Sequence, residues 1–176
     1  KYWDEDWKAT QLIRESNCGV SWLLESSGGG RKFLKWQKRN YENAKELLMH
    51  QHPNFLEGKT FDTGEDTGYI LSPWYEFEEV PRTEATFQEL GALLHWLHGR
   101  GFVHCDLGFY HVKLVEGQMK IIDYGTLTKI GERLKFHWIG NNKCQSLVKH
   151  EIAFPGLDWF SLGFMMGQVQ GLQRAD

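Results

Sequence analysis

Two aspartates in the second half of the chain have the residue type and setting for chemistry on a hydroxyl group or a bound cation. Asp106 lies in the sequence H-C-D-L at 104–107, and Asp123 lies in I-I-D-Y-G at 121–125. Carboxylates bind hard cations and accept protons from hydroxyl groups. The residues between them predict a hairpin over 112–122, with Glu116 and Gly117 as its turn. Both carboxylates lie at the open end of that hairpin, so we expect them to converge on one cleft.

The first half of the chain predicts a small β-rich region. The stretch S-S-G-G-G at 26–30 is a strong turn signal, because successive glycines accept the positive φ that hairpin turns require. Short runs of apolar and β-branched residues on both sides of this turn and further along predict strands. The expected strands cover 11–15, 20–25, 31–36, 60–61 and 68–71.

Apolar residues at helical spacing predict three helices. The first covers 40–50 with Asn40 as its expected N-cap, and the second covers about 83–98, with Gly99 ending it. The third covers 157–169, and short strands are expected at 102–103, 112–115 and 119–122. Strands come first and helices dominate later, which indicates an α+β fold.

This order of helix, loop, hairpin and metal motif resembles the protein kinases, in which H-R-D-L precedes D-F-G. The sequence L-D-W-F-S-L-G at 157–163 is similar to the D-x-W-S-x-G start of the kinase helix beneath the catalytic loop. The resemblance implies a two-lobed α+β fold with a small β-rich N-lobe and a truncated helical C-lobe. It implies one kinase-like domain over 1–176, with an N-lobe at about 1–73, a hinge at about 72–78 and a C-lobe at about 79–176. Such a short, atypical kinase is of a bacterial, effector or viral type.

The resemblance also implies the roles of individual residues. Asp106 would orient the acceptor hydroxyl, and Asp123 would hold a metal ion against the ATP phosphates. Lys35, on the strand with the sequence F-L-K, would bind the α- and β-phosphates. Glu46 would fix Lys35, with Glu42 one turn earlier as the alternative.

Several positions depart from the kinase pattern. Of the glycine-rich nucleotide loop only Gly19 remains, and the glycines at 28–30 are expected to form an ordinary turn. His111 replaces the asparagine that helps to hold a second metal ion, and imidazole favours transition-metal ions over Mg²⁺. Gly108 and Cys105 replace the usual lysine and arginine of the catalytic loop. The resemblance implies that Asp158, in contrast, would keep the family's role of bracing that loop.

We therefore expect an ATP-dependent phosphotransferase that uses Mg²⁺ or Mn²⁺ and phosphorylates a serine or threonine hydroxyl of a protein. The alternatives are a kinase for a small molecule or saccharide, and a catalytically inactive pseudokinase that serves as a binding module. A net charge of -3 without a basic face argues against nucleic-acid binding, and no apolar run predicts a membrane span. The expected compartment is the cytoplasm, or a host cytoplasm for an effector or viral protein. The oligomeric state stays open.

Overall fold

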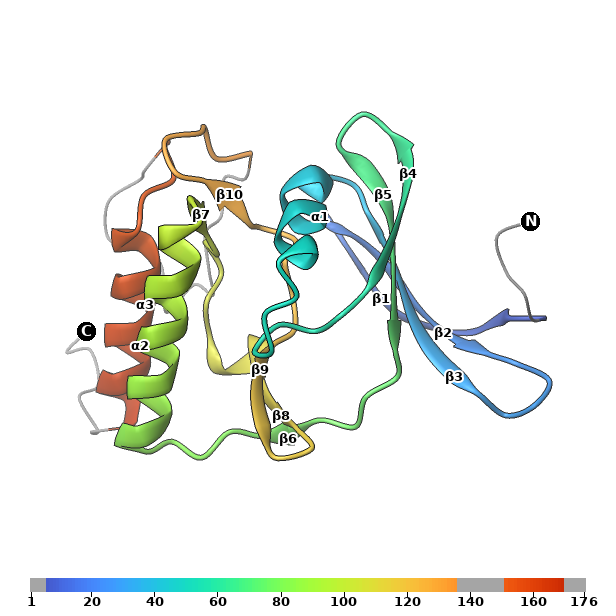
Figure 1. Ribbon diagram of the computed structural model, residues 1–176, viewed down its shortest axis with the longest axis horizontal. Coiled ribbons are helices and arrows are strands. Elements are labelled where there is room, and N and C mark those ends of the chain that lie inside the picture. Colours follow the sequence, from blue (N-terminus) through green and yellow to red (C-terminus); the bar gives the residue numbers. More distant parts are fainter. Residues whose placement is uncertain (1–5, 136–150, 170–176) are drawn as a thin grey trace. The chain divides into compact units, whose positions relative to one another are not determined.

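The computed structural model describes residues 6–135 and 151–169, and it is a mixed α+β structure with a β-rich first part (Figure 1). The chain divides into two compact units between Glu76 and Phe77. Each unit is described by itself below.

The first unit is built on an antiparallel five-stranded sheet with the strand order β1-β2-β3-β5-β4. The strands are β1 (Lys8–Ser16), β2 (Gly19–Glu25), β3 (Arg31–Gln37), β4 (Lys59–Gly64) and β5 (Thr67–Pro73). All five predicted strands are confirmed, although β1 begins earlier and β4 is longer than the apolar pattern indicated. These extra segments are mostly exposed, so hydrophobic periodicity carried little information there.

The predicted glycine turn between β2 and β3 is also confirmed. The Ser26 backbone N–H donates to the Gly30 carbonyl oxygen over 3.0 Å, and Gly29 has a φ of 82°. That left-handed conformation is the one that glycine adopts at little cost. The glycine run at 28–30 is thus explained by the hairpin.

Helix α1 (Tyr41–Met49) follows β3 with Asn40 at its N-cap position, as predicted, but the Asn40 side chain does not supply the cap. Asn40 has a left-handed backbone with a φ of 53°, and its side chain makes no capping hydrogen bond. Instead the Asp66 carboxylate accepts hydrogen bonds from the backbone N–H groups of Asn40, at 2.9 Å, and Glu42, at 3.2 Å. The cap comes from the β4–β5 turn, which local sequence around the helix could not reveal.

The second unit contains two long helices, α2 (Glu84–Gly99) and α3 (Gly156–Val169), which pack side by side (Figure 1). Two small sheets accompany them, with the orders β10-β7 and β6-β8-β9. Their strands are β6 (Glu78–Glu79), β7 (Phe102–Val103), β8 (Val112–Val115), β9 (Gln118–Ile121) and β10 (Thr128–Lys129). The 3-10 turn η1 (Phe109–His111) leads into β8.

The ends of α2 explain where it begins and stops. Its N-cap is Thr83, whose side-chain oxygen accepts a hydrogen bond from the Thr86 backbone N–H. The predicted stop at Gly99 is displaced, because Gly99 is still helical and Gly101 takes the left-handed position, with a φ of 84°. Among the described residues, no helix is both long and apolar enough to cross a membrane.

Candidate active site

A loop between β7 and η1 carries Asp106, and a buried carboxylate from α3 holds this loop in place. Asp158 is fully buried, and its two oxygens accept hydrogen bonds from the backbone N–H groups of His104, at 2.8 Å, and Cys105, at 2.9 Å. The Nε2 atom of His98, on α2, lies 2.9 Å from the same carboxylate. The bracing role expected of Asp158 is confirmed by these contacts.

Cys105 occupies a strained backbone position in this loop. Its φ is 66°, a left-handed value that costs a non-glycine residue roughly 1–2 kcal/mol. The side chain is buried against Val103, Ala153 and Leu157. Burial, with the nearby charge of Asp158, raises the pKa of the Cys105 thiol well above its usual range. A neutral, buried thiol is a packing group and not a nucleophile.

His104 is fully buried beneath the loop, as expected for a packing residue. Its Nδ1 atom accepts a hydrogen bond from the Asp106 backbone N–H at 3.3 Å, so the neutral ring carries its proton on Nε2. That Nε2 atom is buried without a hydrogen-bond partner among the described residues. The backbone of the loop is thus held by both the Asp158 carboxylate and the His104 ring.

His111 lies between Asp106, the predicted catalytic residue, and Asp123, the predicted metal ligand. Its Nδ1 atom lies 2.9 Å from the carbonyl oxygen of Asp106, which can only accept, so Nδ1 carries a proton. Burial, partly offset by the charge of Asp123, lowers the pKa of His111 and favours the neutral ring. The lone pair of the neutral ring is therefore on Nε2, which lies 3.5 Å from Oδ2 of Asp123.

Asp123 is oriented by its own turn, because its Oδ1 atom accepts a hydrogen bond from the Gly125 backbone N–H at 2.8 Å. Its Oδ2 atom and Nε2 of His111 thus face each other as two lone-pair donors. Such a pair suits a shared divalent cation, and the His111 nitrogen favours a transition-metal ion. Within residues 6–135 and 151–169, no three His, Cys, Asp or Glu side chains form a complete metal site. Substrate phosphates and water would have to supply the other donors, which is usual for Mg²⁺.

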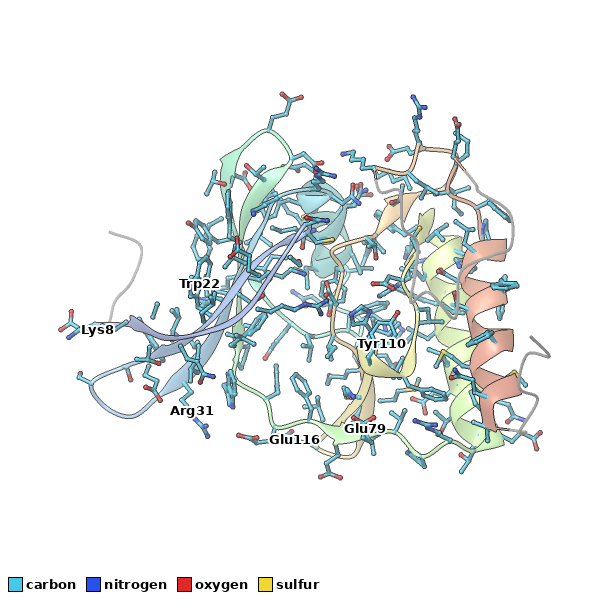
Figure 2. The ribbon with its side chains drawn as sticks, turned by 180° about the vertical axis from the view of Figure 1, so that it is seen from behind. Lys8, Trp22, Arg31, Glu79, Tyr110 and Glu116 are labelled. Atoms are coloured by element: carbon cyan, nitrogen blue, oxygen red, sulfur yellow. The ribbon has the colours of Figure 1, made fainter. Side chains whose placement is uncertain are left out.

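Tyr110 is a site residue that the sequence did not reveal. Its hydroxyl donates a hydrogen bond to Oδ1 of Asp106 over 2.7 Å. Figure 2 shows Tyr110 on the short loop that leads into β8. Two features of the sequence could have indicated this contact. Asp106 and Tyr110 are only four residues apart, and Gly108 between them has no side chain.

Lys35 lies on β3, directly opposite Ser21 of β2 and Ile70 of β5. Residues that face each other across strands share one side of the sheet, and so do alternate residues along a strand. Gly68, two residues before Ile70, faces the ring of Tyr41, because a Cβ atom at Gly68 would lie 2.2 Å from Cζ. Lys35 therefore points to the side of the sheet that α1 covers.

The two glutamates considered as partners of Lys35 both lie on α1. Glu42 is exposed, and its carboxylate lies 3.8 Å from Nζ of Lys45. Glu46 is half-buried. Because Glu42 already neighbours a cation on its own helix, this arrangement favours Glu46, and its pairing with Lys35 stays a prediction.

Gly19, the predicted remnant of a nucleotide loop, has a structural reason to be glycine. It lies at the start of β2, opposite Gln37, and a Cβ atom there would lie 2.0 Å from the carbonyl oxygen of Trp36. The adjoining turn is closed, since the Cys18 backbone N–H donates to Ser16 Oγ at 3.2 Å. The close approach of the strands accounts for this glycine without any ligand.

The structure thus gathers the predicted residues in two groups. Asp106, His111 and Asp123 come together in the second unit, and they are joined there by Tyr110 and Asp158. The other three predicted residues, Lys35, Glu46 and Gly19, belong to the first unit.

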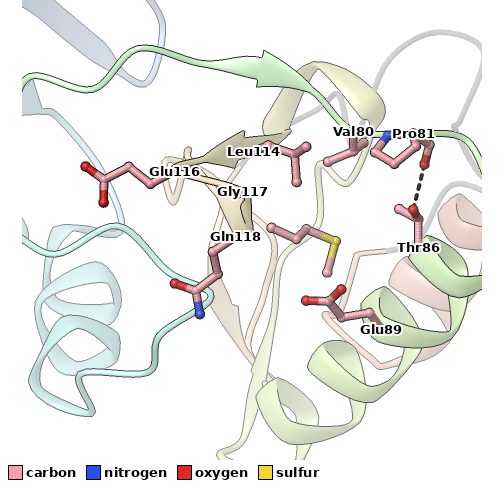
Figure 3. Close-up of a pocket in the computed structure, with 9 residues that line it drawn as sticks. Val80, Pro81, Thr86, Glu89, Leu114, Glu116, Gly117 and Gln118 are labelled. Carbon is pink, nitrogen blue, oxygen red and sulfur yellow. Dashed lines mark hydrogen bonds between the residues drawn. The ribbon is translucent and has the colours of Figure 1, made fainter.

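A pocket of about 510 Å³ in the second unit lies away from this cluster (Figure 3). It is formed by α2, the segment before α2 and the β8–β9 hairpin, and its lining includes Val80, Leu114 and Met119. It contains none of the predicted site residues.

Comparison with known proteins finds a distant similarity to a protein kinase. The chain is 27% identical over 118 residues to a protein of Dictyostelium discoideum described as the probable serine/threonine-protein kinase mkcB. The match covers 60% of this chain and 16% of that protein. No protein-family model matches the chain. The similarity indicates a distant relationship to protein kinases.

Proposed function

We propose that this protein is an ATP-dependent phosphotransferase with a two-lobed, protein-kinase-like domain. The observation that carries the proposal is the cluster of Asp106, His111 and Asp123, in which Asp106 lies on the loop that the buried Asp158 carboxylate braces. Structural packing alone gives no reason for two partly exposed carboxylates to meet a neutral imidazole. Distant similarity to a protein kinase supports the same class of reaction.

In the proposed reaction the oxygen of an acceptor hydroxyl bonds to the γ-phosphorus of ATP. The bond between that phosphorus and the β–γ bridging oxygen breaks, and ADP leaves with the electron pair. Asp106 orients the hydroxyl and accepts its proton. Asp123 and His111 would hold the divalent cation, Mg²⁺ or Mn²⁺, which neutralises charge on the phosphates.

The first unit would supply the nucleotide contacts as the small lobe, and the second unit would be the large lobe. Lys35 would bind the α- and β-phosphates, and Glu46 would hold its ammonium group in place. Gly19 would contribute little, since its strand contact explains it. We propose a protein serine or threonine as the acceptor, by analogy with the described activity of the related protein. A sugar or another small alcohol is the alternative acceptor.

The test is transfer of label from γ-labelled ATP, with Mg²⁺ or Mn²⁺, to the chain itself, to dephosphorylated casein and to a set of simple sugars. Label is expected in the wild type and should be lost in Asp106→Asn and in Asp123→Asn. Glu132→Gln, an exposed carboxylate in the same unit, is the matched control and should transfer normally. Equal labelling by wild type and Asp106→Asn would remove the catalytic claim, and the acceptor that carries the label would decide its class.

A pseudokinase is the second candidate, and the closed β1–β2 turn favours it. In that turn the Cys18 backbone N–H and carbonyl groups are already engaged, by Ser16 and by the Lys38 N–H at 3.0 Å. Thermal unfolding with ATP and each metal shows whether the protein binds nucleotide, because a ligand of the native state raises the melting temperature. A melting temperature that rises with metal–ATP, together with no transfer of label, would identify a nucleotide-binding pseudokinase.

A further inference from the structure

The hydrogen bond between Tyr110 and Asp106 has no counterpart among the expected catalytic roles. The Tyr110 hydroxyl donates to Oδ1 of Asp106 over 2.7 Å, a length typical of a hydroxyl bound to a charged carboxylate. Tyr110 is 37% exposed, and the Asp106 side chain is 25% exposed. The contact therefore lies at the surface where an acceptor would have to arrive.

Gly108 makes the room for this contact. A Cβ atom at Gly108 would lie 2.4 Å from Cε1 and 2.7 Å from Cζ of Tyr110, so any side chain there would displace the ring. The backbone of Gly108 is extended, with a φ of -170°, which every residue can adopt. Position 108 therefore needs glycine because it has no side chain, and not because its backbone is flexible.

His111 packs against the same ring. The two ring centroids are 4.4 Å apart and the planes meet at 69°, an edge-to-face arrangement. Tyr110 is thus held between Gly108 and His111 with its hydroxyl on Asp106.

The two oxygens of Asp106 consequently differ. Oδ1 is engaged by Tyr110, whereas Oδ2 lies 3.8 Å from Nδ1 of His111, beyond hydrogen-bond distance. That Nδ1 proton goes to the Asp106 carbonyl oxygen. Across the described part of the chain, Oδ2 has no hydrogen-bond donor, so it is the oxygen open to an incoming hydroxyl.

We infer that Tyr110 is a positioning residue, which fixes the Asp106 carboxylate by its Oδ1 atom and presents Oδ2 to the acceptor hydroxyl. The inference rests on the proposed phosphotransferase function. Oδ2 receives the acceptor's proton as the acceptor oxygen bonds to the γ-phosphorus and ADP leaves. The residue that fixes the carboxylate then acts on the rate of transfer and not on nucleotide binding.

Two variants test this from different directions, with γ-labelled ATP and dephosphorylated casein or the chain itself as acceptor. Tyr110→Phe keeps the ring and removes the hydroxyl, whereas Gly108→Ala keeps the hydroxyl and displaces the ring. Each should lower kcat by roughly tenfold and leave the KM for ATP unchanged, as loss of one partly exposed charge-assisted hydrogen bond implies. The double variant should be no slower than either single one, because both break the same contact.

Tyr41→Phe is the matched control, since it removes a Tyr–Asp hydrogen bond of nearly the same length, 2.8 Å, in the first unit. It should lower the melting temperature and leave kcat unchanged. Wild-type kcat in Tyr110→Phe, with Asp106→Asn inactive, would overturn the role of Tyr110 alone. A higher kcat in Tyr110→Phe would also overturn it and show that Tyr110 blocks the acceptor. Equal label in wild type and Asp106→Asn would overturn the phosphotransferase proposal, and this inference with it.

Discussion

Replacement of Asp158 should release the loop that carries Asp106, with a loss of stability that the structure allows us to estimate. Asp158 accepts three hydrogen bonds, from the backbone N–H groups of His104 and Cys105 and from the ring of His98. Asp158→Ala leaves all three buried donors without their acceptor. Breaking a buried, charged interaction from one side costs about 3–5 kcal/mol, so we expect a loss of about 4 kcal/mol in the free energy of unfolding.

Asp158→Asn should cost less, because the amide keeps the shape and one accepting oxygen. The NH₂ group of the asparagine, however, would face one of the N–H donors that Asp158 now accepts from, so at least one hydrogen bond is lost and the others weaken. We expect a loss of about 2 kcal/mol. His98→Phe removes one of the three donors and leaves the two backbone contacts, so it should cost roughly 1 kcal/mol.

Thermal and urea unfolding of the whole chain test whether the loss of stability falls from Asp158→Ala through Asp158→Asn to His98→Phe. For a chain of this length about 1 kcal/mol shifts the melting temperature by roughly 2–4 °C, so Asp158→Ala should melt about 10 °C below the wild type. Glu132→Gln, an exposed carboxylate of the same unit, should melt within about 2 °C of it. A melting temperature of Asp158→Asn within that same range of the wild type would refute the bracing role.

Four further predictions concern other parts of the structure. Asp66→Ala removes the cap from α1 and should destabilise the protein by about 1–2 kcal/mol in urea unfolding, whereas Asp66→Asn should retain part of the cap. Equal stability of the wild type and both variants would contradict the capping role of Asp66. Gly68→Ala forces a methyl group into the ring of Tyr41 and should cost about 1–3 kcal/mol, and an unchanged urea midpoint would show that the ring can move aside. The raised pKa of Cys105 keeps the folded thiol neutral, so iodoacetamide at pH 8 should label the half-exposed Cys18 in the native protein and Cys105 only after unfolding. Rapid labelling of Cys105 in the native protein would contradict its burial. Stability that depends on this thiol is present below the unfolded pKa and is lost as the pH rises above it, so urea midpoints should fall between about pH 9 and 11 in the wild type and less in Cys105→Ala.

The elements that sequence predicted well are those whose signals are local. Helices α2 and α3 show continuous apolar stripes, and the β8–β9 hairpin has its turn residues Glu116 and Gly117, both with positive φ. The hairpin brings Asp123 back toward the loop of Asp106, as its order along the chain implied. The mixed α+β class followed from the same local patterns.

Contacts between distant segments could not be predicted in this way. Asp66 caps α1 from another turn, and the local sequence pointed to Asn40 instead, whose backbone is left-handed. Gly19 was interpreted as the remnant of a nucleotide loop. A glycine is needed wherever another group comes too close for a side chain, and the sequence does not distinguish a phosphate from the carbonyl oxygen of Trp36.

The loop that carries Asp106 shows the same difficulty at short range. Gly108 was interpreted as the loss of a lysine contact, whereas the structure shows that its missing side chain admits the ring of Tyr110. A comparison with the kinase pattern treats each position by itself. The reason for a glycine at 108, however, depends on Tyr110, two positions later. Cys144, the third cysteine, lies outside the described residues.

The most direct test of the central claim is a crystal structure with a non-hydrolysable ATP analogue and Mn²⁺. We predict that Asp123 and His111 bind the Mn²⁺ ion, and that Lys35 lies within hydrogen-bond distance of the α- or β-phosphate. The γ-phosphate should then face Oδ2 of Asp106. A nucleotide bound elsewhere, or a metal ion that contacts neither Asp123 nor His111, would contradict the proposal that these residues form one phosphotransferase site.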